Sequence, residues 1–232
     1  MSDCNFGIQH YLNTINHYLE AGYHIGPVSD YFQQKIYDKQ ILLRHDVDLS
    51  LDYALDMALL EKDHDIHATY YILLQTGLYN ALSREGTRKI REIKEAGHEI
   101  GLHIDSRYYL GQIEFSMLEH IAQCNVMSWC HHLITITPSL TIARDAAKIP
   151  YKYLSDSAMN WREGCWCNHI NRYDKLQILI HPAWRMVSPS GLRTKWEILE
   201  DLEEKAKGNL ALSFRDFRDL VKSYEQTVTV YS

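Results

Sequence analysis

The chain has 232 residues, of which 46% are hydrophobic and 23% charged, and its formal net charge is −6. These values are typical of a folded globular protein and exclude a disordered chain. Acidic charge without a basic run also argues against nucleic acid or an anionic membrane as a partner, because both require clustered lysine and arginine. The length fits one domain over residues 1–232 and leaves the oligomeric state open.

No apolar run approaches the roughly 18 residues of a membrane-spanning helix, and the first residues lack the positive start of an export signal. We therefore expect no transmembrane segment and a cytoplasmic location. Five cysteines at irregular spacing argue against a disulfide framework. Cys165 and Cys167 form a close pair, but C-x-C is a weak metal signal without a second pair, so reduced structural thiols are expected.

The apolar residues of 6–21 recur at helical spacing and predict a first helix that stops at Gly22. Beyond it, short apolar runs alternate with helical patterns, with Ser50 as a helix N-cap and Gly97 as a helix stop. Strands are expected over 41–43, 68–74, 99–104, 126–130, 151–154 and 176–180. Helices are expected over 51–59, 83–96, 112–123, 140–148 and 193–207. This alternation predicts a parallel sheet, either open or closed into a barrel.

Polar residues at the strand ends favour the barrel. No glycine-rich nucleotide-binding pattern follows a predicted strand, which weakens the case for an open nucleotide-binding sheet. In a (β/α) barrel, catalytic groups gather at the C-terminal ends of the strands. Six polar side chains stand at or just past such ends: Asp46, Asp48, His103, His132, Asp156 and His181.

Residue parity indicates which of these side chains converge. Asp46 and Asp48 are two apart on an extended segment and point to one side, and the same argument favours His132 over His131 as the residue that faces the barrel axis. Converging carboxylates and imidazoles suit a divalent cation such as zinc. Such a metal supports hydrolysis of an amide or ester at neutral pH, with Asp46 as the base and His181 as the acid.

Three segments resemble motifs of the polysaccharide deacetylase family, also called the NodB-homology carbohydrate esterases. The family's T-F-D-D motif is similar to Arg44-His45-Asp46-Val47-Asp48. Its G-H-E-I-G-x-H-[ST]-x-x-H motif is similar to residues 97–107, and its late strand closing on histidine to Leu179-Ile180-His181; Asp156 and Trp161 resemble its Asp/Trp motif. Over roughly 41–181 the resemblance implies a distorted (β/α) barrel of about seven strands and a zinc-dependent deacetylase with the first aspartate as base and the late histidine as acid.

Two departures change the expected ligand set. Val47 stands where the family has a metal-binding aspartate, so Asp48 takes that role one residue later. Arg107 stands at the second metal-binding histidine and cannot ligate. The expected metal ligands are therefore Asp48, His103 and His132, with His131 or Asp105 as alternatives to His132.

The expected activity is removal of an N-acyl (acetyl) group from a sugar or glycan precursor, in surface polysaccharide biosynthesis. Trp161 and Arg162 are expected to line the sugar site, since aromatic rings stack on sugars and arginine supplies fixed donors. Arg44 and Asp156 complete the expected substrate-binding set. Two alternatives stay open: a metal-independent C–N hydrolase of the same fold, and a glycan-binding barrel without turnover.

Structural roles remain possible for each group. Asp46 and Asp48 also suit a turn that caps the following helix. His181 precedes a proline, which by itself ends a strand in an extended form. His131 and His132 also read as a polar strand end.

Overall fold

The computed structural model describes residues 4–105, 111–132 and 144–208, and within them eight strands form one parallel sheet. Seven strands follow a single hydrogen-bonded path in the order β6-β5-β4-β3-β2-β8-β7, and β1 pairs with β2 beside that path. The strands are β1 (His24–Gly26), β2 (Gln40–Val47), β3 (Thr69–Leu73), β4 (Glu99–Ile104), β5 (Ser128–His131), β6 (Arg144–Asp145), β7 (Lys152–Ser155) and β8 (Lys175–Ile180).

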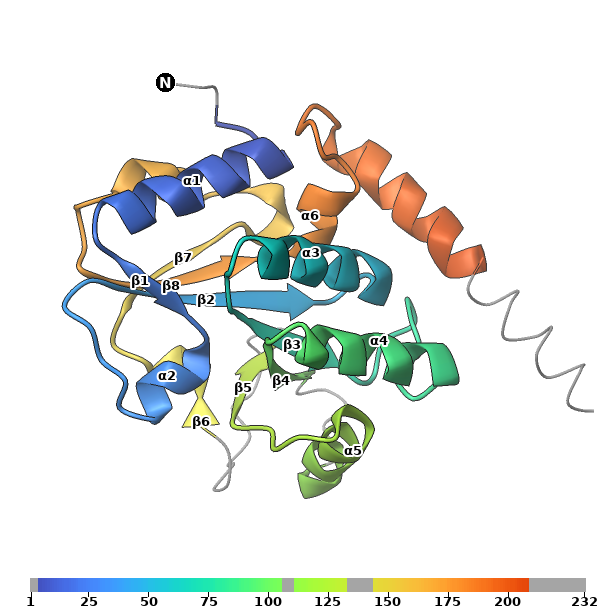
Figure 1. Ribbon diagram of the computed structural model, residues 1–232. Coiled ribbons are helices and arrows are strands. Elements are labelled where there is room, and N and C mark those ends of the chain that lie inside the picture. Colours follow the sequence, from blue (N-terminus) through green and yellow to red (C-terminus); the bar gives the residue numbers. More distant parts are fainter. Residues whose placement is uncertain (1–3, 106–110, 133–143, 209–232) are drawn as a thin grey trace, which may run out of the picture.

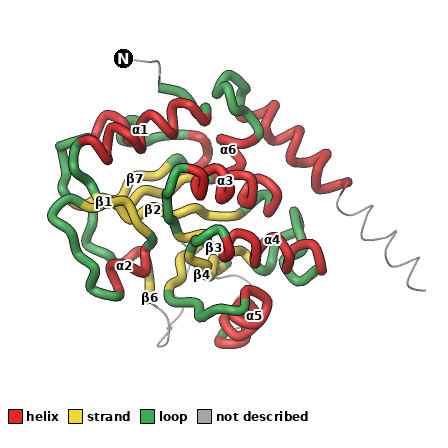
Figure 2. The backbone as a smooth tube through the Cα atoms, viewed as in Figure 1, coloured by secondary structure: helices red, strands yellow, loops and turns green. Residues whose placement is uncertain are grey.

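Helices follow the strands along the chain and cover the sheet. They are α1 (Ile8–Glu20), α2 (Val28–Phe32), α3 (Leu51–Asp63), α4 (Arg84–Glu95), α5 (Gln112–Ala122), α6 (Pro182–Met186) and a last helix over 195–208. Figure 1 shows α3, α4 and α5 following one another beside β2, β3 and β4, and Figure 2 shows the yellow strands gathered between the red helices. The predicted α/β fold, a distorted barrel of about seven strands, is confirmed, with β6 and β7 at the two ends of the path.

The local signals place most elements where the sequence predicts them. The Ser50 hydroxyl accepts a hydrogen bond from the Tyr53 amide at the start of α3, and Ser83 does the same for Gly86 at the start of α4. Gly97 has φ +100°, a left-handed conformation that ends α4 at little cost only for glycine. These caps fix where each helix returns to the next strand.

The predictions missed β1 and α2, which are too short to show periodicity. The helix expected over 140–148 is wrong for 144–148, which form strand β6 and the 3-10 helix η1 (Ala146–Lys148); residues 140–143 lie outside the described residues. In the described part of the chain, no helix combines the length and the apolar character needed to cross a bilayer.

Alternate residues of β2 face opposite sides of the sheet. Ile41, Leu43 and Val47 belong to the main hydrophobic cluster beneath the helices. Leu42 belongs to a smaller cluster inside the barrel, together with Tyr71. Because Arg44 and Asp46 share parity with Leu42, β2 carries their side chains into the barrel interior at its C-terminal end.

Candidate active site

Asp46 lies near the end of β2, where Arg44 binds its carboxylate. The Arg44 Nη2 donates to both carboxylate oxygens of Asp46, at 2.7 and 2.9 Å, and the guanidinium lies 4.7 Å from the centre of the Tyr71 ring. Burial works against ionisation, but the charge of Arg44, followed by that of His103, outweighs it and holds the pKa of Asp46 below its usual range. Asp46 is therefore ionised at neutral pH.

Asp48, His103 and His132 bring three potential ligand atoms together. Asp48 Oδ1 lies 3.0 Å from His103 Nε2 and 3.4 Å from His132 Nδ1, and the two nitrogens are 3.2 Å apart. Asp48 follows β2, His103 comes from β4, and His132 follows β5. The pairing of these strand ends thus joins residues 29 to 84 positions apart into a compact triangle.

This triangle fits a divalent cation. Tetrahedral zinc with ligands at about 2.0–2.1 Å separates them by about 3.3 Å, close to the three observed distances. Among the described residues, Asp48 Oδ1 is buried without a partner in hydrogen-bond geometry, although two ring nitrogens lie beside it. His103 Nδ1 faces the carbonyl oxygen of Cys130 at 3.4 Å, so donation there leaves the Nε2 lone pair directed at the triangle, as in zinc-bound histidines.

The charges in the triangle reinforce one another. Burial opposes the ionisation of Asp48, but the two imidazoles outweigh it and hold the pKa of the Asp48 carboxyl well below its usual range. The close approach of the Asp48 carboxylate in turn raises the pKa of His132. A cation bound here would take the place of the protons shared by these groups.

His181 is held by a buried carboxylate behind it. Its Nδ1 lies 2.7 Å from Asp156 Oδ1, its backbone amide donates to the same oxygen at 3.0 Å, and its Nε2 lies 3.6 Å from Asp48 Oδ2. Burial lowers the pKa of His181, but the hydrogen bond and charge of Asp156 outweigh this and raise it to about 9. The ring therefore presents a proton on Nε2 towards the triangle at neutral pH.

Two residues expected to bind substrate lie behind the catalytic candidates. Arg44 is 4% exposed with its guanidinium on Asp46, and Asp156 is fully buried with its carboxylate on His181. A side chain buried in this way positions the group in front of it. Direct contact of Arg44 and Asp156 with substrate stays a prediction.

Trp161 and Arg162 are also not joined to the site. Trp161 packs half-buried against the main hydrophobic cluster, and Arg162 is exposed. No hydrogen bond or ion pair within 4–105, 111–132 and 144–208 connects either of them to Asp46 or His181. Their expected role in sugar binding remains a prediction.

The two alternatives to His132 as the third ligand, His131 and Asp105, lie in different surroundings. The His131 ring packs edge-to-face on Trp129, 4.8 Å between centres, on the side of the strand away from His132. Asp105 is buried, and its charge acts on His132. Arg107 lies outside the described residues.

Sequence analysis missed Cys130 as a member of this site. Its thiol lies 3.0 Å from His103 Nδ1 and 3.6 Å from Asp46 Oδ1. Its place two residues before His132 on the same face of β5 was the available signal. Cys130 and Asp46 also form a second group with His103 that offers three ligand atoms.

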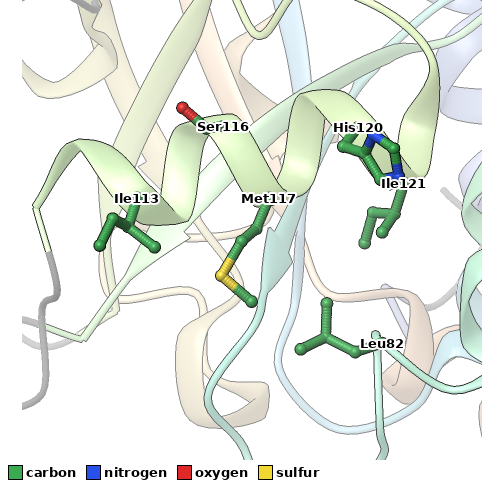
Figure 3. Close-up of a pocket in the computed structure, with 6 residues that line it drawn as sticks. All are labelled: Leu82, Ile113, Ser116, Met117, His120 and Ile121. Carbon is green, nitrogen blue, oxygen red and sulfur yellow. The ribbon is translucent and has the colours of Figure 1, made fainter.

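Two hollows differ in character. One has a volume of about 10 Å³, roughly the space for one water, and is lined by Asp46, Asp48, Ser50 and His181 among others. The other, about 350 Å³ and shown in Figure 3, lies between α5 and Leu82 and is lined mainly by apolar side chains, with His120 as its ionisable member. The small hollow, at the polar cluster, is the one suited to a hydrolytic water.

Comparison with known proteins gives structural similarities only. No protein-family model matches the chain, and no curated protein does. Among solved structures, a family 4 carbohydrate esterase pseudoenzyme from Bacillus anthracis is 14% identical, with a TM-score of 0.48, over 72% of this chain and 62% of its own. The matched region thus spans less than two thirds of that protein.

Two deacetylases are similar to a comparable degree. The peptidoglycan deacetylase PdaC from Bacillus subtilis is 17% identical, with a TM-score of 0.45, over 77% of this chain and 96% of its own. The deacetylase PplD from Streptococcus pyogenes, in complex with acetate, is 14% identical, with a TM-score of 0.45, over 78% and 84%. Identities and TM-scores this low do not establish a shared function. The function of the site is therefore argued from this chain's own side chains.

Proposed function

We propose that this chain is a metal-dependent hydrolase that removes an N-acyl group from a sugar, with a divalent cation, zinc, held by Asp48, His103 and His132. The observation that carries the proposal is the triangle of ligand atoms, 3.0 to 3.4 Å apart, between the ionised Asp46 and the protonated His181. The motif resemblance supplies the substrate class, an N-acetylated sugar or glycan precursor for surface polysaccharide.

The reaction needs one base and one acid. A cation held by Asp48, His103 and His132 would lower the pKa of a water and polarise the acyl carbonyl. Asp46 accepts a proton from the attacking water while the oxygen of that water bonds to the acyl carbon. His181 donates its Nε2 proton to the departing nitrogen as the C–N bond breaks, so the products are a carboxylic acid and an amine.

Two positioning residues support these roles. Arg44 orients the Asp46 carboxylate by three hydrogen bonds and keeps it ionised. Asp156 orients the His181 ring and stabilises its charged form, as a carboxylate does for a histidine acid. Neither of them needs to touch substrate.

Acetate release from N-acetylhexosamine monomers, nucleotide-linked sugars and oligomers tests the proposal. Asp46→Asn and His181→Asn are each expected to reduce release by about 10²- to 10⁴-fold while the chain stays folded. Asp65→Asn and His67→Asn are matched controls, because these side chains are exposed and remote in sequence from the site. Wild-type activity retained in either site variant contradicts the assigned roles.

Elemental analysis of the purified chain separates the alternatives. A divalent metal that is present in the wild type and reduced by one equivalent in His103→Ala supports the proposal. Turnover that is unchanged in His103→Ala favours the metal-independent hydrolase. Sugar binding without turnover, unaffected by Asp46→Asn, favours the glycan-binding barrel.

A further inference from the structure

Four metal-ligating side chains meet in a second cluster, remote in sequence from the first. Cys4 precedes α1, His10 lies on α1, and Cys165 and Cys167 lie at the start of the 3-10 helix η3 (Trp166–His169). Each offers one ligand atom, and all four atoms lie within 4.8 Å of one another. Cys4 Sγ is 3.0 Å from Cys167 Sγ, and His10 Nε2 is 3.3 Å from Cys165 Sγ.

The backbone around this cluster is firmly held. Trp166, between the two cysteines, is fully buried and stacks on Tyr11 and Tyr18 of α1, with ring centres 5.8 and 5.5 Å away. The Tyr18 hydroxyl donates to the Trp166 carbonyl at 2.7 Å. Figure 1 shows α1 lying against the gold-coloured chain that contains this turn. The C-x-C segment is therefore presented to α1 in a fixed orientation.

The buried guanidinium of Arg185 is an independent sign that negative charge belongs here. Arg185 is fully buried, and among the described residues its Nε and Nη2 lack hydrogen-bond partners. Asp156 Oδ2 lies 3.8 Å from its Nη2, and its Nη1 donates at 3.5 Å to the carbonyl oxygen of Asn5, the residue that follows Cys4. Three thiolates on a dication carry a net charge of −1, which would balance Arg185.

A disulfide explains the cluster less well. The separation of 3.0 Å between the sulfurs of Cys4 and Cys167 exceeds an S–S bond of about 2.05 Å. A disulfide between them would also leave His10 and Cys165 unexplained. Tetrahedral zinc places sulfurs about 3.8 Å apart, so Cys4, which is exposed, needs to move outward by less than about 1 Å.

We propose that Cys4, His10, Cys165 and Cys167 form a second metal site, a closed four-ligand zinc site that joins the N-terminal segment to the turn at η3. Three cysteines and one histidine are a ligand set of structural zinc, which leaves no open position for catalysis. The site would stabilise the fold and supply Arg185 with a counter-charge. Since Arg185 also faces Asp156, the site would support the group that holds His181.

Cobalt substitution of the full chain tests this site separately from the Asp48 site. Thiolate ligands give cobalt(II) a near-ultraviolet charge-transfer absorption that carboxylate and imidazole ligands do not. The absorption is expected in the wild type and in His103→Ala, and is expected to be lost in the double variant Cys165→Ser, Cys167→Ser. Cys124→Ser is the matched control that keeps it, because Cys124 belongs to neither metal-ligand cluster of the described residues.

Further measurements keep the proposal testable if the double variant does not fold. Cys4→Ser removes the exposed ligand near the chain end and is expected to speed zinc release to a chelator at least about tenfold. A thiol titration of the denatured, metal-free chain is expected to give five thiols. Absence of the thiolate band from the wild type, its retention in the double variant, or a disulfide between Cys4 and Cys167 would overturn the proposal.

Discussion

Strand β2 separates two clusters that each contain a carboxylate and histidines. In one cluster both carboxylate oxygens have partners, and in the other cluster one oxygen has no hydrogen-bond partner within the described part of the chain. Beneath the helices, Glu61 accepts hydrogen bonds from the hydroxyls of Tyr11 and of Tyr70, the latter at 2.7 Å, and lies 2.8 Å from His45 Nε2. Inside the barrel, the residue after His45 begins the second cluster, in which Asp48 Oδ1 meets imidazole nitrogens without hydrogen-bond geometry.

The difference teaches how a structural carboxylate is told from a functional one. Both oxygens of Glu61 are partnered, and its side chain is fully buried, so the cluster is complete as it stands. Asp48 retains 17% exposure and an unsatisfied oxygen, so its cluster remains able to take a cation. The number of histidines does not distinguish the two roles. A buried carboxylate oxygen without a hydrogen-bond partner does.

The largest expected effect is on turnover, from Asp48→Asn. Removal of this charge is expected to lower metal affinity and turnover by at least about 100-fold, since even the outer partners of metal ligands contribute 10- to 100-fold. In the metal-free chain only the ion pairs of Asp48 with His103 and His132 are lost, so the denaturation midpoint is expected to change less than in Glu61→Ala. Turnover and denaturant titration check the two parts, with Asp65→Asn as the control; a large loss of metal-free stability would make Asp48 a structural residue.

Glu61→Ala should show the opposite pattern. It leaves two tyrosine hydroxyls and His45 without their shared acceptor, and is expected to reduce the free energy of unfolding by about 3–5 kcal/mol. Urea denaturation measures the loss, and Glu85→Ala, at an exposed position on α4, is the control. If Glu61→Ala were as stable as the control, the contrast between the two clusters would not hold.

Tyr70→Phe probes one partner of Glu61 at a time. It removes the hydrogen bond of 2.7 Å to Glu61 and keeps the ring in the core, so a loss of about 1–3 kcal/mol is expected. Tyr37→Phe, which changes an exposed ring, should alter stability by less than about 0.5 kcal/mol. Equal stability of the two variants would show that the Tyr70 hydroxyl is not needed.

The smallest expected effect is a dependence of stability on pH. Burial lowers the pKa of His98, whose Nδ1 accepts a hydrogen bond from the Ala68 amide. Burial alone would raise the pKa of Glu61, but the charge of His45 outweighs it and lowers that pKa. Groups with a lowered folded-state pKa stabilise the fold above their unfolded pKa, so stability should decline as pH falls below about 6.5 and again below about 4.5.

Denaturation midpoints measured between about pH 8 and pH 4 check this dependence, because that range includes the ordinary pKa values of histidine and glutamate. His98→Gln should flatten the first decline, and His67→Gln, at an exposed neighbouring position, should not. An unchanged slope in His98→Gln would assign the first decline to other histidines.

Parity along single strands was enough to predict much of the site. Asp46 and Asp48 were predicted on one side, and His132 rather than His131 on the inner face; the contacts of His103 with Asp48 and His132 agree with both. These inferences succeed because an extended backbone sets side-chain direction over a few residues.

Longer-range relationships escaped the sequence. The contacts of Arg44 with Asp46 and of Asp156 with His181 were not predicted, because they depend on what each side chain meets in the folded chain. β1 and α2 were missed because elements of three and five residues show too little periodicity.

The sequence alone therefore defines the alternation of strands and helices, the strand ends that carry polar groups and the side of the strand on which each lies, since all follow from local backbone geometry. Only the tertiary structure brings Cys4 and His10 to Cys165 and Cys167, across up to 163 residues, or shows that Glu61 is satisfied and Asp48 is not. Such contacts depend on the packing of α1 and α3 against the sheet, and sequence spacing carries no information about that packing.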